Sequence, residues 1–218
     1  MDFDSIIAKR RSIRKFLSVP LEKEAWASIL VAGARAPSSG NLQNWKLIIV
    51  ESAEQRKTLA HICYNQMWIA NAALLIIVCA DTKIATQFYG VRGERLYSVQ
   101  NCAAMVQNML LKATQLGVGS CWVSAFDETK LKTHFSIPDF IRPQSIVALG
   151  YADEVVPEPP RKAYLEYCYF ERYGNQLSEN MRNIQYRQFG KIVARRAAGA
   201  GQMLKDIKEK LLARLRGG

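Results

Sequence analysis

The chain has 218 residues, of which 49% are hydrophobic and 22% are charged, and its formal net charge is +11. This length and apolar content exclude a largely disordered chain and allow one substantial core. No apolar run reaches the roughly eighteen residues of a membrane-spanning helix, and the start, MDFDSIIAKRRS, lacks the basic flank of a signal peptide. We therefore expect a cytoplasmic globular protein.

The positive charge is concentrated at the end of the chain. Residues 175–218 hold ten Lys and Arg against three Asp and Glu, a surplus of +7, which leaves +4 for the other 174 residues. A basic chain can bind nucleic acid, an anionic membrane or a phosphorylated ligand. Most of the excess belongs here to a tail, whose last segment has a helical leucine stripe with basic residues beside it.

The cysteines and histidines predict neither a disulfide framework nor a metal site. Five cysteines lie far apart without a C-x-x-C pair, and the chain has only two histidines. We expect buried, reduced thiols and no metal held by the protein.

The first predicted elements are two helices. Phe3, Ile6 and Ile7 give an apolar face to a helix at the start of the chain. A second helix is expected from Pro20, because proline suits a first helical turn, and residues 36–41 end it.

Four strands and one long helix are predicted after these. The strands are β-rich apolar runs at 45–50, 73–80, 120–126 and 145–151. The helix spans 95–116, and its buried stripe is predicted from apolar residues at steps of three and four: Leu96, Val99, Ala103, Val106, Leu110 and Ala113. Such alternation suggests a parallel doubly wound sheet, but G-x-G-x-x-G and the P-loop pattern are both absent, so spacing leaves the strand order open.

The stretch GVGSCWVSAF, at 117–126, resembles a thiol-protease signature only superficially. A papain-type nucleophile needs a histidine well over a hundred residues downstream, whereas the only later histidine, His134, follows Cys121 by thirteen. We reject that interpretation. The glycines at 117 and 119 either turn the chain into a strand or let its backbone approach a flat ligand.

Two further segments combine polar and cationic groups. Arg10-Arg11-Ser12-Ile13-Arg14 could clamp a phosphate through charge-assisted hydrogen bonds, or form a solvated basic face. The loop Pro37-Ser38-Ser39-Gly40-Asn41-Leu42-Gln43-Asn44 leads into a strand that begins with Trp45. Turn chemistry alone explains its composition.

These motifs in this order resemble the FMN-dependent nitroreductase family. The likeness rests on residues 10–16, on Ala36–Ser39 with Asn41, Gln43 and Trp45, on 116–126, and on Arg161 after Gly150-Tyr151. It implies an α+β, three-layer fold with a central mixed, largely antiparallel sheet flanked by helices, completed by homodimerisation. The FMN-binding domain would span 1–174, and 175–218 would be a basic, partly helical extension.

The resemblance also implies a set of cofactor contacts. The phosphate would be held by the N-terminal basic segment and Arg161, and Arg14 would lie near the pyrimidine edge of the flavin. The 37–41 loop would reach the flavin of the other subunit, and Gln66 would be a further ring contact. The implied FMN-binding residues are Arg10, Arg11, Ser12, Arg14, Pro37, Ser38, Ser39, Asn41, Gln66, Gly119, Ser120 and Arg161. Asn44 departs from the pattern, because the family usually has proline there.

The implied activity is transfer of a hydride from NAD(P)H through FMN to a nitroaromatic, quinone or similar acceptor, in a ping-pong cycle without a catalytic side chain. Reductive dehalogenation or flavin breakdown on the same fold remain alternatives. Another is a flavin- or anion-binding module whose basic tail contacts nucleic acid or membrane. We prefer a tail helix packed across the dimer.

Overall fold

The structure, a computed structural model, describes residues 1–176. Two compact units divide the chain, one from Met1 to Val156 and one that begins at Pro157. The domain boundary predicted at 174 stays a prediction. Within 1–176, no helix is both long enough and apolar enough to span a bilayer.

A four-stranded antiparallel sheet lies at the centre of the first unit. Its order is β1-β2-β4-β3, so the two middle strands are far apart in the sequence. The strands are β1 (Trp45–Val50), β2 (Leu74–Asp81), β3 (Gly119–Val123) and β4 (Ile141–Gly150). All four predicted strands are confirmed, β1 over the predicted residues and the other three with shifted ends, and the antiparallel pairing excludes a parallel doubly wound sheet.

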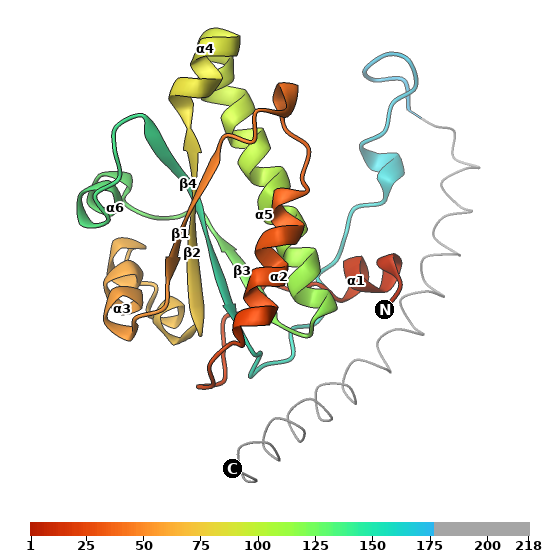
Figure 1. Ribbon diagram of the computed structural model, residues 1–218. Coiled ribbons are helices and arrows are strands. Elements are labelled where there is room, and N and C mark those ends of the chain that lie inside the picture. The colour runs from red at the N-terminus through yellow and green to blue at the C-terminus, as the bar shows by residue number, and fades with distance from the viewer. Residues whose placement is uncertain (177–218) are drawn as a thin grey trace. The chain divides into compact units, whose positions relative to one another are not determined.

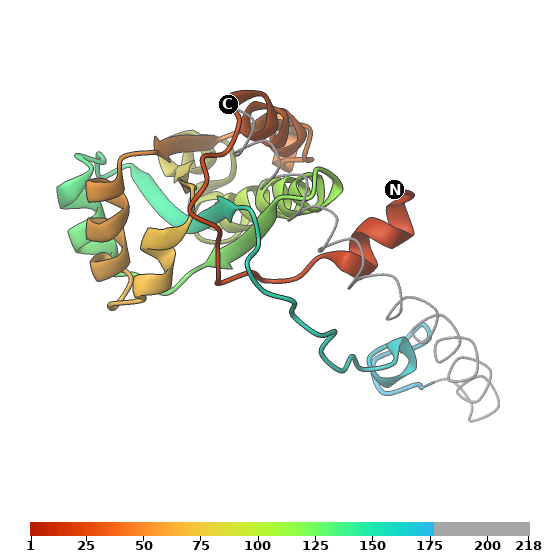
Figure 2. The ribbon, with the colours of Figure 1, turned by 90° about the horizontal axis from the view of Figure 1, so that it is seen from below.

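Helices cover both faces of this sheet (Figures 1 and 2). Side chains alternate along β2: Leu75 and Ile77 join the core on one face, and Leu74 and Ile76 join the core on the other. The first face packs against α3 (Ala53–Ile62) and α6 (Glu128–His134), and the second against α2 (Lys23–Ala34) and α5 (Ser98–Gln115). This is the α+β, three-layer arrangement that the resemblance implied.

The first unit also contains α1 (Phe3–Lys9), α4 (Thr82–Arg92) and the short helical turns η1 (Ser39–Asn41), η2 (Met67–Asn71) and η3 (Gly93–Tyr97). The second unit contains the short helical turn η4 (Tyr164–Glu166). Gly90 interrupts α4 with φ +57° and ψ −149°, a conformation that essentially only glycine adopts. The segment after Tyr89 therefore takes a new direction before α5 begins.

Three details of the predicted helices are wrong. The second helix begins at Lys23 rather than Pro20, because Glu22 is extended and its carboxylate accepts a hydrogen bond from Tyr151 Oη at 2.9 Å. The long helix begins at Ser98, after η3, and Val99 is 40% exposed instead of buried. In α1 only Ile6 is buried, whereas Phe3 and Ile7 are exposed. The predicted tail helix lies outside the described residues.

Candidate functional site

The arginine-rich segment is bound to the sheet through its backbone. Ser12 forms a parallel bridge with Ser120, and the Ile13 N–H donates to the Ser120 carbonyl at 3.0 Å. Further along, the Leu17 N–H donates to the Tyr151 carbonyl at 2.8 Å. The structure thus brings together two motifs that lie more than a hundred residues apart in the sequence, the basic segment and the start of β3.

Gly119 permits this close approach. A Cβ on Gly119 would lie 3.0 Å from the Gly150 carbonyl oxygen and 3.2 Å from both Cγ atoms of Ile13. Ile13 is itself buried, so its side chain cannot turn away into solvent. The glycine predicted from the motif is therefore required for packing in this chain, whatever else it contacts.

Charged and polar groups of the basic segment act on Cys121, next to Ser120. Burial raises the pKa of the Cys121 thiol; the charge of Arg14, a hydrogen bond from Ser12 and the charge of Arg10 oppose that effect, and the charge of Glu154 adds to it. The thiol stays neutral, which agrees with the rejection of a cysteine nucleophile. The charges of Arg10 and Arg14 and the hydroxyl of Ser12 thus act on the same thiol at the start of β3.

Arg14 and Arg11 are oriented differently. The backbone N–H groups of Arg14 and Lys15 both donate to Glu154 Oε1, and the exposed Arg14 guanidinium lies 5.8 Å from the centre of the Trp68 ring. Arg11 Nη1 donates to the carbonyls of Ala8 and Arg10 at 2.7 and 2.8 Å, so it caps the end of α1. The predicted FMN contacts of Arg11 and Arg14 both stay predictions.

Gln66 lies beside Trp68 and links two loops. Its Nε2 donates to the Cys63 carbonyl at 2.9 Å and to the Ala125 carbonyl at 3.3 Å. The side chain therefore connects the end of α3 with the residues after β3. Its predicted contact with the flavin ring stays a prediction.

The loop at 37–41 has a tightly constrained backbone. Gly40 and Asn41 both have positive φ, +53° and +56°, and a Cβ on Gly40 would clash with the Tyr89 hydroxyl of α4. Ser38 Oγ accepts the Gln43 N–H at 3.0 Å. Pro37 and Asn41 are exposed, whereas Ser38 and Ser39 are half-buried.

Sequence reasoning missed the polar residues that hold this loop. Asn44, Ser98 and Asn101 are all buried, and Asn101 accepts hydrogen bonds from the backbone and side chain of Ser39. The one available signal was Asn44, a polar residue directly before an apolar strand, where the resemblance implied a proline. Nothing in the pattern of α5 indicated that its first turn buries polar side chains.

Within the first unit, the loop and the basic segment lie at opposite ends of α5. Ser39 is bonded to Asn101 in the first turn of that helix, whereas the Val118 N–H, just before β3, donates to the Ala113 carbonyl near its end. Twelve helical residues rise by roughly 18 Å. Arg161 belongs to the second unit, where its side chain is exposed, and its predicted contact stays a prediction.

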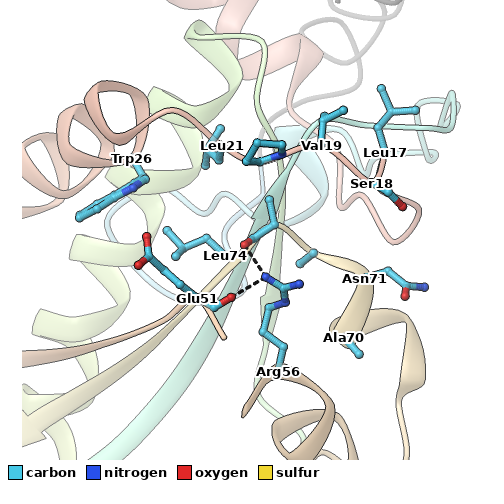
Figure 3. A pocket seen from close by; sticks show the side chains of 13 residues that line it. Leu17, Ser18, Val19, Leu21, Trp26, Glu51, Arg56, Ala70, Asn71 and Leu74 are labelled. Carbon is cyan, nitrogen blue, oxygen red and sulfur yellow. Dashed lines mark hydrogen bonds between the residues drawn. The ribbon is translucent and has the colours of Figure 1, made fainter. Parts of the chain in front are cut away.

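A separate pocket of about 440 Å³ contains none of the predicted cofactor residues. In Figure 3 its central polar group is Arg56, whose Nη1 donates to the Glu51 and Ala73 carbonyls at 2.7 and 2.8 Å. Burial lowers the Arg56 pKa from its usual value. Arg56 thus pairs with backbone carbonyls that would otherwise lack partners there, and this pocket is not the candidate site.

Comparison with known proteins decides the family. The sequence model described as "Nitroreductase family" matches residues 7–151, which include the basic segment, the loop and the start of β3. The chain belongs to the nitroreductase family. A relative from Archaeoglobus fulgidus, named "Putative NADH dehydrogenase/NAD(P)H nitroreductase", is 35% identical over 67% of this chain and 83% of its own length.

Two other relatives of this nitroreductase-family chain have informative names. The Vibrio harveyi protein named "NADPH-flavin oxidoreductase" is 29% identical over 71% of this chain and 68% of its own length. A crystal structure of a "Putative NADH dehydrogenase/NAD(P)H nitroreductase" from Parabacteroides distasonis has a TM-score of 0.69 and 25% identity, and it covers 78% of this chain and 98% of its own. The family match ends at Tyr151, so Arg161 and the tail lie beyond it.

Proposed function

We propose that this chain is an FMN-dependent oxidoreductase that passes a hydride from NAD(P)H to a nitroaromatic, quinone or similar small acceptor. The proposal is carried by one observation, the bridge that sets the basic segment against the start of β3. Family membership and relatives named for NAD(P)H and flavin reactions support the same function.

The side chains at that bridge suit a flavin mononucleotide. Two guanidinium groups and a hydroxyl match the charge and acceptors of a phosphate dianion, and arginine forms paired hydrogen bonds with phosphate. Arg10 and Ser12 would hold the phosphate, together with Arg161 as the sequence predicts. The neutral Cys121 thiol adds no negative charge there, and the one carboxylate bonded to this segment, Glu154, already accepts the backbone N–H groups of Arg14 and Lys15.

Arg14 would tune the reaction. Its guanidinium is exposed and lies over Trp68, so it can face a flat ring bound beside it. A cation near the pyrimidine edge stabilises the negative charge that reduction places there. Bound FMN would supply the hydride chemistry itself, so the chain needs no nucleophilic side chain. Donor and acceptor would bind in turn at the same place, which gives ping-pong kinetics.

The second half of the site would come from a partner subunit. The 37–41 loop is separated from the basic segment by most of the length of α5, yet the resemblance assigns both to one flavin. A homodimer resolves this if each loop reaches the flavin of the other chain. The exposed Phe3 and Ile7 of α1 are apolar surface that such an interface would bury.

The test is the visible spectrum of the purified full-length chain during titration with FMN. We expect tight binding, bleaching of the flavin band when NADH or NADPH is added without oxygen, and recovery when a nitroaromatic or quinone follows. A matched variant, Arg142→Ala, removes an exposed arginine that pairs with Glu128 and should bind FMN like the wild type. A chain that binds no FMN, or whose bleached flavin is reoxidised by neither acceptor, contradicts the proposal.

A further inference from the structure

Asn44 is a buried residue directly before β1, and both the nitrogen and the oxygen of its side-chain amide form hydrogen bonds. It is 1% exposed. Its Nδ2 donates to the Asp81 carbonyl at 3.0 Å and to Ser98 Oγ at 3.1 Å, and its Oδ1 accepts from Asn101 Nδ2 at 2.8 Å. A buried amide bonded through both hydrogens and its oxygen has one fixed orientation, because any other leaves a buried group unpaired.

Asn101 transmits this fixed position to the loop. Its Oδ1 accepts the Ser39 backbone N–H at 3.0 Å and the Ser39 hydroxyl at 3.2 Å. The two asparagines therefore form a continuous path from the core to the first residue of η1. Asn101 is only 3% exposed, so water cannot readily replace these contacts.

The loop needs such an anchor because its backbone is strained. Asn41 and Gln43 have φ of +56° and +47°, a region that residues with a side chain rarely occupy. Strained conformations persist only where the surroundings hold them. A proline at 44 would restrict the chain through its own ring. Asn44 has no ring, but its three hydrogen bonds restrict the same point.

A second branch of the network reaches α4. Ser98 Oγ donates to the Gly93 carbonyl at 3.0 Å, just after the bend at Gly90. Tyr89, on the other side of that bend, lies against Gly40 of the loop. The same side chains thus hold the loop and the end of the helix that covers it.

We infer that Asn44 and Asn101 are positioning residues that hold the 37–41 loop in its flavin-binding conformation. This inference rests on the proposed function, because it assigns the loop to FMN. Neither asparagine needs to touch the cofactor.

The experiment compares Asn44→Ala, Asn101→Ala and the double variant with the control Asn108→Ala. Asn108 lies on the same helix and donates one hydrogen bond, to the Ala32 carbonyl at 3.3 Å, away from the loop. Amide hydrogen exchange of peptides covering the loop is measured without FMN, and the FMN dissociation constant and thermal midpoint are measured separately.

Both loop variants should exchange their loop amides at least about tenfold faster than the control, measured relative to the amides of β2, and bind FMN at least about tenfold more weakly. Their thermal midpoints should also fall, because each substitution leaves buried polar groups without partners. The FMN dissociation constant of the double variant should exceed that of the weaker-binding single variant by no more than about twofold, because both asparagines act through one path. Loop exchange and FMN affinity within about twofold of the control would overturn the inference.

Ser98→Ala and the wild type provide two further comparisons. Ser98→Ala removes one of the three bonds of Asn44 and should give an intermediate effect; unchanged loop exchange in that variant counts against the inference even if Asn44→Ala fails to fold. A wild-type chain that binds no FMN overturns the proposed function, whereas wild-type binding with unaltered affinity in both asparagine variants overturns this inference alone.

Discussion

Replacing Gly119 by alanine should damage both stability and cofactor binding. The added methyl group would lie 3.0 Å from the Gly150 carbonyl oxygen and 3.2 Å from two carbons of Ile13. Neither neighbour can yield easily, because one is backbone in the sheet and the other is buried. Overpacking of this kind costs about 1–3 kcal/mol. For a chain of this size that corresponds to a thermal midpoint lower by roughly 2–12 °C.

The same change should separate the basic segment from β3. To make room for the methyl group, Ile13 must move outward. This movement lengthens the hydrogen bond from the Ile13 N–H to the Ser120 carbonyl, which is 3.0 Å in the wild type. Ser12 moves with it, so FMN affinity should fall by about tenfold or more. Urea unfolding followed by tryptophan fluorescence measures the stability, and flavin fluorescence measures the binding.

Ile13→Ala provides the control for this reasoning. It removes the two carbons that the new methyl would meet, so Gly119→Ala should cost about 1 kcal/mol less in that background than in the wild type. The contact with the Gly150 carbonyl remains and keeps the cost above zero. If Gly119→Ala changes the unfolding free energy by the same amount in both backgrounds, the packing argument is refuted.

Two other predictions concern charge and protonation. Arg10→Ala should weaken FMN binding by about tenfold or more, whereas Arg11→Ala should chiefly lower the thermal midpoint by uncapping α1; the reverse pattern in a flavin titration and a melting curve would contradict these roles. Burial raises the pKa of Cys63, Cys79 and Cys102 to about 12. The unfolded chain releases these thiol protons near pH 9, whereas the folded chain retains them. The stability that the thiols contribute is therefore complete below pH 9 and is lost as the pH rises toward 12. The loss amounts to at most about 1.4 kcal/mol per pH unit for each thiol. Tyr and Lys side chains also titrate in this range, so Cys102→Ala is compared with the wild type. The unfolding free energy of the variant should fall less steeply with rising pH. An equally steep fall in both proteins would show that burial does not raise the pKa of this thiol.

The layers of the fold could be predicted because their physical signals are local. The strand at 45–50 is a β-rich apolar run, and the structure has β1 over the same residues. Strand order could not be predicted, because the middle pair, β2 and β4, is formed by segments far apart in the chain. The resemblance implied a largely antiparallel sheet but not its order.

The first turn of α5 shows why apolar patterning fails near a site. The pattern assigned Val99 to the core, but Ser98 and Asn101 take the core-facing positions there and Val99 is exposed. These polar residues of α5 can face inward because Asn44, which precedes β1, completes their hydrogen bonds. That partner comes from a distant segment, so the composition of the helix alone cannot reveal it.

The positions of the motifs were predictable only in part. Ser12 and Ser120 were expected to contact one cofactor, and the structure brings them together through a backbone bridge. The 37–41 loop was expected to reach the flavin of the other subunit, and within one chain it lies at the other end of α5 from the basic segment. This placement is compatible with the proposed site shared between two chains, which stays a prediction.

A mixed dimer tests this central claim most directly. One chain carries Arg10→Ala with Arg14→Ala, the other carries Ser39→Ala with Asn41→Ala, and the two bear different affinity tags so that the mixed species can be purified. If each flavin lies between a basic segment and the loop of the partner, one site is intact and the other has lost both halves. Bound FMN should then amount to one per mixed dimer, against two in the wild type and nearly none in either parent homodimer at the same concentration. A mixed dimer that binds no more FMN than its parents would show that each site is built within a single chain.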